Sequence, residues 1–455
     1  MIVLCMRCIL LRWRRRSSPR GATWLMLRLV TLVLLIGPLG CRQNSPAAVA
    51  VSSRGALAPV AGNDPIDGEI RRLQQTLGGP AAGDADAWLR LAQALIRKAR
   101  QARDERIYAQ ADDAAARALR LAPDLSGAHH VQLAVLLHDH RFRDAQARAA
   151  ALLRRSPRDA TAWGALGDSA VELGDYSAAQ QAYQAMLDVK PDLRSYSRGA
   201  WLRYLLGDGD GAIELMGQAI DAGSPRDPES KAYCRVQRAE LLALRGRYTE
   251  SQVELDRALQ ELPSYAPARA ARGRLLLHAL GDPATALPEL EAALAQDPQL
   301  STRISLLEAH EALGHAGAAS EQHRLILLEG PRQDPRTLAL FLASRRQQTE
   351  RAVGLAQDEA QQRPDLWSLD ALAWAQHQAG RSDLAWPLIQ RATEPGIIDP
   401  RIDYHLGVIA EARGDRARAR SALRRALSTS PGWDRRDAAE ATALLRRMEA
   451  TERAP

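Results

Sequence analysis

Apolar and small residues recur at three- and four-residue spacings along most of the chain, and short polar stretches interrupt them. The clearest example lies between residues 159 and 193, where Gly174 separates two helix-length segments and Pro191 closes the second. The apolar and small positions of the two segments are Trp163, Leu166, Gly167, Ala170 and Leu173, then Ala179, Tyr183 and Met186. Because a proline cannot continue a helix, this pattern predicts a helix, a tight turn, a second helix and a stop.

The same unit repeats along the chain with a nearly constant period. The small residue that opens each second helix stands at Ala111, Ala145, Ala179, Ala212, Ser251, Ala286, Ala319, Ala352, Ala385 and Ala419. The steps between these positions are 34, 34, 33, 39, 35, 33, 33, 33 and 34 residues. Turn glycines fall between the two helices of most units, at Gly174, Gly207, Gly246, Gly281, Gly314, Gly380 and Gly414. A period of this length indicates a repeat architecture.

The order of residues within one unit resembles the tetratricopeptide repeat (TPR). The matching positions are Trp163, Leu166-Gly167, Tyr176, Ala179, Tyr183, Met186 and Pro191. The resemblance spans roughly residues 84–434 and implies an all-α, right-handed α-solenoid of about ten helix–turn–helix units. Gly167 and Ala179 stand where two helices approach closely, so a larger side chain there is expected to overpack the contact by roughly 1–3 kcal/mol.

The chain divides into five segments on this pattern. Composition and periodicity predict a signal segment at 1–40, a flexible tether at 41–65, an N-terminal capping helix at 66–83, the solenoid at 84–434, and a C-terminal capping helix and tail at 435–455. In a solenoid each repeat buries its core against its neighbours, so a bulky residue at Ala179 is expected to disturb mainly the adjoining units.

The first 40 residues are typical of a targeting segment. A basic run precedes the apolar stretch 29–36, which is too short for an ordinary transmembrane helix. Gly40-Cys41 at its end resembles the lipobox of bacterial lipoproteins, although Pro38 and Leu39 depart from it. The true start is either Met1 or Met26.

The lipobox resemblance implies an address in the cell envelope. Cys41 would be lipidated and become the mature N-terminus, which anchors the repeats on the periplasmic side of a membrane. By analogy with lipoprotein sorting, Arg42 favours the outer membrane. The alternative is an uncleaved signal anchor in the inner membrane.

Charge and cysteine content narrow the functional classes. The formal net charge is +7, and seven arginines lie before position 41 without an acidic residue among them. The remainder is therefore close to neutral, and we expect no nucleic-acid partner. Cys5, Cys8 and Cys41 fall in the first 41 residues and Cys234 stands alone, so no disulfide framework is expected in the folded part.

Several local patterns imitate catalytic or metal sites. His310 and His315 are five residues apart with Gly314 between them, whereas a zinc-protease helix needs its histidines four apart. The glycine-rich stretch 207–211 lacks a preceding strand and the later ligands of a calcium loop. The histidines at His129, His130, His138 and His140 suit helix ends as well as a metal. With no P-loop and no nucleophile motif, the sequence predicts no enzyme, no cofactor and no metal.

The resemblance implies a protein or peptide partner held in a concave groove lined by the first helix of each unit. Two groups of unpacked residues on such helices are candidates for contact: Arg194, Arg198, Trp201 and Tyr204 on one helix, and Phe341, Trp374 and Tyr404 in three successive units. Core packing explains these aromatic residues equally well. The chain has three lysines, none at a carboxylate-clamp position, so no free C-terminus is required of the ligand.

Family resemblance thus favours a protein-binding scaffold of the envelope, of the kind that assembles pili, secretion systems or polysaccharide export machinery. An architectural spacer or oligomerisation module without a specific ligand is the alternative. A metal-dependent enzyme is a third and weaker possibility. The oligomeric state stays open at this point.

Overall fold

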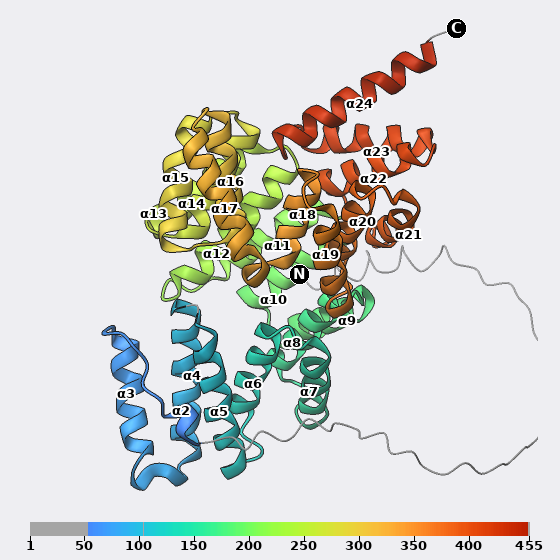
Figure 1. Cartoon of the computed structure of the whole chain (residues 1–455). Helices are drawn as coiled ribbons and strands as arrows, with labels where there is room; N and C mark the ends of the chain where they lie inside the picture. The colour runs from blue at the N-terminus through green and yellow to red at the C-terminus, as the bar shows by residue number, and fades with distance from the viewer. Residues whose placement is uncertain (1–52, 103, 454–455) are drawn as a thin grey trace, which may run out of the picture. The chain divides into compact units, whose positions relative to one another are not determined.

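A computed structural model describes residues 53–102 and 104–453. Within these ranges the chain is built from α-helices with short turns, one 3₁₀ turn and one π-helical turn, and no strand is present (Figure 1). The predicted signal segment and Cys41 lie outside the described residues. No helix in the described part is both long enough and apolar enough to cross a bilayer.

Ten helix pairs follow one another, and the two helices of each pair pack antiparallel through a tight turn (Figure 1). The pairs are α4 (Ala85–Ala102) with α5 (Glu105–Leu121), α6 (Ser126–His138) with α7 (Phe142–Arg155), α8 (Ala160–Glu172) with α9 (Tyr176–Val189), α10 (Leu193–Leu205) with α11 (Gly209–Asp221), α12 (Pro228–Leu244) with α13 (Tyr248–Glu261), α14 (Ala266–Arg274) with α15 (Pro283–Gln296), α16 (Leu300–Ala312) with α17 (Ala316–Gln333), α18 (Pro335–Ser344) with α19 (Thr349–Gln362), α20 (Leu366–Gln378) with α21 (Ser382–Thr393), and α22 (Pro400–Ala412) with α23 (Arg416–Thr429). A π-helical turn, η2 (Leu275–Ala279), extends α14. The predicted all-α solenoid of about ten units is confirmed.

Local sequence signals set the ends of these helices. Aspartate side chains accept a backbone N–H from the first turn at many helix starts, namely Asp64, Asp104, Asp159, Asp175, Asp192, Asp208, Asp227, Asp282, Asp334, Asp365, Asp399 and Asp415. All seven turn glycines have positive φ, between 69° and 86°. In two of the three units without a turn glycine, His140 and Arg346 adopt this left-handed conformation instead.

The small residues that define the period form the seam between the helices of each pair. All ten are buried. A Cβ added at Gly167 would clash with the ring of Tyr183, whose hydroxyl donates to Asp168 at 2.8 Å. Gly273 and Gly407 approach leucines of the facing helix in the same way. Small residues are therefore required because the paired helices touch there.

Segments outside the pairs cover the first unit and follow the last one. They are α2 (Ser53–Ala56), α3 (Pro65–Leu77), the 3₁₀ turn η1 (Pro80–Gly83) and α24 (Arg435–Arg453). Residues 56–62 depart from the flexible tether that the composition predicted. Ala56 and Val60 are buried, and the side-chain amide of Gln74 donates to the carbonyl of Ala58 at 2.8 Å. Burial of these apolar groups, together with hydrogen bonds to the backbone, holds the segment against the first helices.

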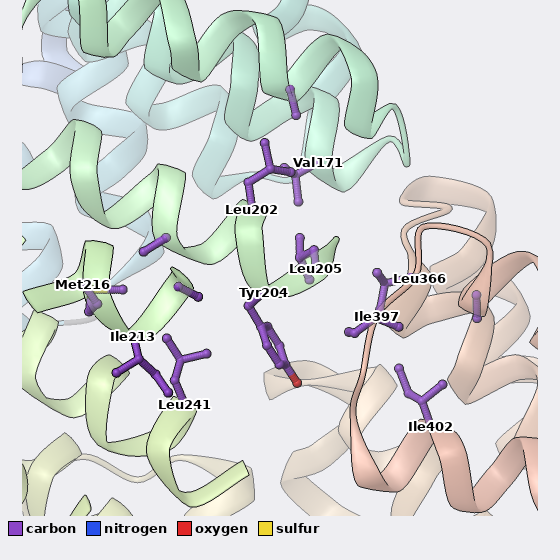
Figure 2. Close-up of a cluster of buried hydrophobic side chains, with 14 of the residues drawn as sticks. Val171, Leu202, Tyr204, Leu205, Ile213, Met216, Leu241, Leu366, Ile397 and Ile402 are labelled. Carbon is purple, nitrogen blue, oxygen red and sulfur yellow. The ribbon is translucent and has the colours of Figure 1, made fainter. Parts of the chain in front are cut away.

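The repeat array also returns on itself, so that units far apart in sequence share a core. Figure 2 shows Leu366, Ile397 and Ile402 opposite Tyr204 and Leu205, and all of these side chains belong to one buried cluster. The third and fourth helix pairs thereby contact the ninth and tenth, six units later. The expectation that each repeat buries its core only against its neighbours is therefore incomplete.

Backbone and tyrosine contacts make this return specific. The backbone N–H of Leu366 donates to the hydroxyl of Tyr176 at 2.8 Å, and the N–H of Gly432 donates to the hydroxyl of Tyr248, also at 2.8 Å. Both tyrosines are the first residue of their helix. The turn glycines of the same units lie close to backbone carbonyls of the later units. A Cβ added at Gly174, for example, would stand 2.8 Å from the carbonyl oxygen of Pro364. We call this contact between early turns and late loops the return interface.

Candidate functional site

A cavity of about 430 Å³ lies beside the return interface. Helices of both parts of the array line it: α10, α12, α13, α14 and η2 from the early and middle units, and α20, α22 and the start of α24 from the late ones. This volume is within the range of roughly 300–1,000 Å³ that is common for ligand pockets. The return of the array therefore brings helices of early and late units around one space.

An aromatic wall forms one side of the cavity. Trp201 and Tyr204 come from α10, and Trp367 comes from α20, with ring centroids 5.4 Å (Trp201–Tyr204), 6.4 Å (Trp201–Trp367) and 6.4 Å (Tyr204–Trp367) apart. The hydroxyl of Tyr204 donates to Asp399 at 2.6 Å. Burial, with Asp399 alongside, raises the pKa of Tyr204 well above its usual value. Tyr204 is thus a fixed structural contact, while the two tryptophans are only partly buried.

Arg401 presents a guanidinium group to this wall. Its Cζ lies 5.2 Å from the centroid of the Trp367 ring, and the side chain is 39% exposed. Its Nε is buried without a hydrogen-bond partner, and its nearest charged contact is Asp370 at 3.9 Å. The guanidinium donates no hydrogen bond to any of the described residues. An arginine has five N–H donors, so this group is available to an incoming acceptor.

The opposite side of the cavity is polar, and its arginine side chains form ion pairs. Arg274 donates to Glu240 at 2.6 Å. Asp437 lies 3.2 Å from Arg436. Burial, with Asp434 nearby, raises the pKa of Asp437 to about 6 although Arg436 opposes the shift. Arg274 and Arg436 are therefore each paired with a carboxylate on this side.

A histidine and two carboxylates gather at the edge of the cavity. One ligand atom from each of His278, Glu308 and Asp434 lies within 4.8 Å of the others. The imidazole Nε2 of His278 is 3.5 Å from Glu308. Burial, with Asp434 adding to it, raises the pKa of Glu308 to about 8, and burial lowers the pKa of His278. The sequence had predicted no metal ligands, because these three residues are widely separated along the chain.

Only part of the first predicted group of contact residues lies in the cavity. Trp201 and Tyr204 line the cavity. Arg198 instead donates twice to Asp168 at 2.8 Å, and Arg194 lies exposed in the first turn of α10. Helical spacing did place the four residues on one helix. It did not reveal that Arg198 would form an ion pair with Asp168.

The second predicted group belongs to the core. Phe341, Trp374 and Tyr404 are 6%, 2% and 2% exposed and lie in one buried cluster. Trp374 and Tyr404 are in contact at 5.5 Å between ring centroids, and the indole N–H of Trp374 donates to Ser344 at 2.9 Å. The structure thus corrects the predicted aromatic ladder along the groove, since these rings fill space between helices.

Sequence reasoning missed Trp367, Arg401 and Trp433 as cavity residues. Trp367 and Arg401 each stand two places after the capping aspartate of a first helix, at Asp365 and Asp399. That shared position was a usable signal.

The histidines near residue 130 contact different partners. His130 pairs with Asp159 at 2.7 Å, and His138 stacks on Tyr108.

A tetratricopeptide repeat family model matches residues 134–194 and 164–231. These residues run from α6 into α12, and the same helix pair continues on both sides of them. This match identifies residues 134–231 as tetratricopeptide repeats. Such repeats are in general non-catalytic scaffolds whose concave surfaces bind proteins, and the TPR fold supports that class of function here.

Several solved TPR structures are similar in fold. The TPR protein TTC0263 from Thermus thermophilus is 22% identical, with 42% of this chain and 99% of that chain covered and a TM-score of 0.38. PilW, a type IV pilus biogenesis factor, is 18% identical, with 46% and 96% covered and a TM-score of 0.39. Yeast Tom70 is 14% identical, with 85% and 93% covered and a TM-score of 0.37. No curated protein matches the sequence significantly.

Proposed function

We propose that this TPR protein is a scaffold of the bacterial cell envelope that holds a short extended segment of a partner protein in the cavity beside the return interface. The observation that carries the proposal is the guanidinium of Arg401, which lines the cavity, donates no hydrogen bond to the described residues and lies against Trp367. Arginine and tryptophan are the residue types enriched at the energetic centres of protein interfaces.

The charges around Arg401 favour a neutral acceptor. Asp370 is 3.9 Å from its Nε, and Asp399 caps the same helix. These carboxylates already balance the guanidinium, so a third carboxylate would be repelled. Backbone carbonyls of an extended segment are neutral and can each accept one N–H from the guanidinium. This chemistry requires no free C-terminus of the partner.

The rings beside Arg401 favour an apolar side chain next to those carbonyls. Trp201 and Trp367 lie 6.4 Å apart between centroids and are only partly buried, so part of their surface is open to a ligand. Covering aromatic surface stabilises a complex by about 25 cal/mol per Å². A segment with one apolar residue between two exposed carbonyls suits this arrangement.

Arg401→Gln is expected to weaken partner binding roughly ten- to a hundredfold, because hydrogen bonds to a charged donor contribute about 1.5–3 kcal/mol. The partner is captured on the wild-type chain from detergent-solubilised envelopes, and its affinity for purified variants is then measured. The matched control is Arg418→Gln, since Arg418 also lies over a tryptophan, Trp386 at 5.0 Å, but outside the cavity.

Equal binding by Arg401→Gln and wild type, with both folded by circular dichroism, would show that the cavity is not the binding site. Capture of no partner, together with self-association of the wild-type chain in detergent, would favour the architectural alternative. In that case Arg401→Gln and Arg418→Gln should not differ in self-association.

The envelope address rests on the sequence of the N-terminal segment. Gly40-Cys41 follows an apolar stretch of signal length, and a basic run precedes that stretch. We propose that Cys41 carries the lipid, that the repeats lie on the periplasmic side, and that the anchor is in the outer membrane. An uncleaved inner-membrane anchor is the competing arrangement.

Cys41→Ala is expected to abolish incorporation of a labelled fatty acid and to leave the chain either uncleaved or soluble. The matched control is Cys234→Ala, because Cys234 is fully buried in α12 and cannot reach a lipid-transfer enzyme. Label should persist in this control. Equal labelling of Cys41→Ala and wild type would contradict the lipoprotein assignment.

A further inference from the structure

The cluster of His278, Glu308 and Asp434 brings three metal-ligating groups together from distant segments. His278 comes from η2, Glu308 from α16, and Asp434 immediately precedes α24. Their ligand atoms lie within 4.8 Å of one another, and Nε2 of His278 is 3.5 Å from Glu308. Two ligands bound tetrahedrally to one zinc ion at about 2.1 Å are about 3.4 Å apart. The separation of His278 and Glu308 already matches that spacing, and the remaining ligand atoms would have to close from at most 4.8 Å.

Neither carboxylate of this cluster has an arginine or lysine within ion-pair distance among the described residues. Of the arginines around it, Arg274 holds Glu240, Arg345 holds Glu311 and Arg436 holds Asp437. Arg435 adds a further positive charge near His278. Asp434 uses one oxygen to accept the N–H of Asp437 at 3.0 Å, which leaves the other oxygen to a ligand. Two adjacent half-buried carboxylates without a cation of their own favour a bound cation.

The backbone at His278 is irregular in a way that sets the site apart from the other units. In η2 the N–H of Leu280 donates to the carbonyl of Leu275 at 3.1 Å, five residues back. The step from Ser251 to Ala286 is 35 residues, where most others are 33 or 34, and the π turn lies within it. Inserted π turns are often found at functional sites because they re-aim side chains.

We infer that His278, Glu308 and Asp434 bind one divalent transition-metal cation, with Zn²⁺ as the best fit. One imidazole and two carboxylates are hard-to-borderline donors that suit zinc. Three protein ligands leave a coordination position open, and His278 and Asp434 both line the cavity. The metal would also join the start of α24 to the sixth and seventh helix pairs.

The test is zinc binding by the full chain, purified in mild detergent without a histidine tag. We expect one Zn²⁺ per chain by calorimetry and mass spectrometry, and a rise in melting temperature with Zn²⁺. Asp434→Asn and Glu308→Gln should each lower zinc affinity at least tenfold. Asparagine caps a helix as well as aspartate does, so Asp434→Asn is expected to fold.

The control variants separate this site from others on the chain. His323→Gln should bind zinc as wild type does, because His323 is outside the cluster and its Nε2 lies 3.0 Å from the side-chain oxygen of Gln347. Arg401→Gln should also retain zinc, so failure of the proposed peptide site leaves this test intact. In the wild-type chain, Co²⁺ should give the visible absorption bands of a four- or five-coordinate site. Absence of those bands, or zinc binding unchanged in Asp434→Asn and Glu308→Gln, would overturn the inference.

Discussion

Gly207→Ala is expected to destabilise the protein by about 2–5 kcal/mol and to loosen two stretches of the chain that are almost 200 residues apart. Gly207 has φ of 86°, which a residue with a Cβ adopts at a penalty of about 1–2 kcal/mol. The added Cβ would also clash with the carbonyl oxygen of Gly396 across the return interface. Overpacking of this kind costs about 1–3 kcal/mol more.

Gly414→Ala is the matched control for this prediction. Gly414 is the turn glycine of the tenth pair, its φ is 81°, and a Cβ there would have no atom within 4 Å. The two variants therefore share the backbone strain and differ in the contact with the late loop. Their difference in free energy of unfolding measures what the return interface contributes at this turn.

Urea unfolding and hydrogen exchange provide the measurements. In Gly207→Ala, amide protection should fall both around α10 and α11 and in residues 394–406, which share the buried cluster. In Gly414→Ala the loss should stay near α22 and α23. Equal destabilisation by the two variants, with loss confined to adjoining units, would mean that the array is held together by nearest neighbours alone.

Trp374→Ala is expected to cost about 3–5 kcal/mol, the range for removing a buried large aromatic side chain. Trp374 is 2% exposed and stacks on His405 at 4.1 Å between centroids. Its loss would leave a void between α20 and α22 and would remove the donor to Ser344. The midpoint of urea unfolding should fall accordingly.

Trp201→Ala is the natural comparison, because Trp201 was predicted from the same kind of pattern. It is only partly buried and lines the cavity, so its removal should cost less stability and weaken partner binding. A Trp374→Ala variant that is as stable as wild type but fails to bind the partner would reinstate the aromatic ladder along the groove. That outcome would contradict the core assignment.

The fold followed from the sequence because its signals are local and periodic. Ala179 is required by contact with the partner helix of its own pair, and Asp175 caps the helix that carries it. Gly174 terminates the preceding helix with φ of 75°. Such interactions span fewer than about 35 residues, so each can be recognised in one repeat and counted in the next.

The site was only half predictable. Trp201 and Tyr204 were chosen because helical spacing placed them on a first helix, and both line the cavity. The same reasoning chose Phe341 and Tyr404, which are core. Spacing shows that residues share a helix, but burial of a first-helix side chain depends on the helices beside it.

By itself the sequence determined the helix pairs, their number and their turns, since these depend on capping, small-residue seams and left-handed glycines within each unit. The tertiary structure alone decided that the third and fourth pairs meet the ninth and tenth. That contact depends on the small rotation between successive units. The rotation accumulates over six units and cannot be recognised in the sequence of any single unit. For the same reason only the structure could bring Trp201 to Trp367, leave Arg401 facing a cavity, and gather His278, Glu308 and Asp434.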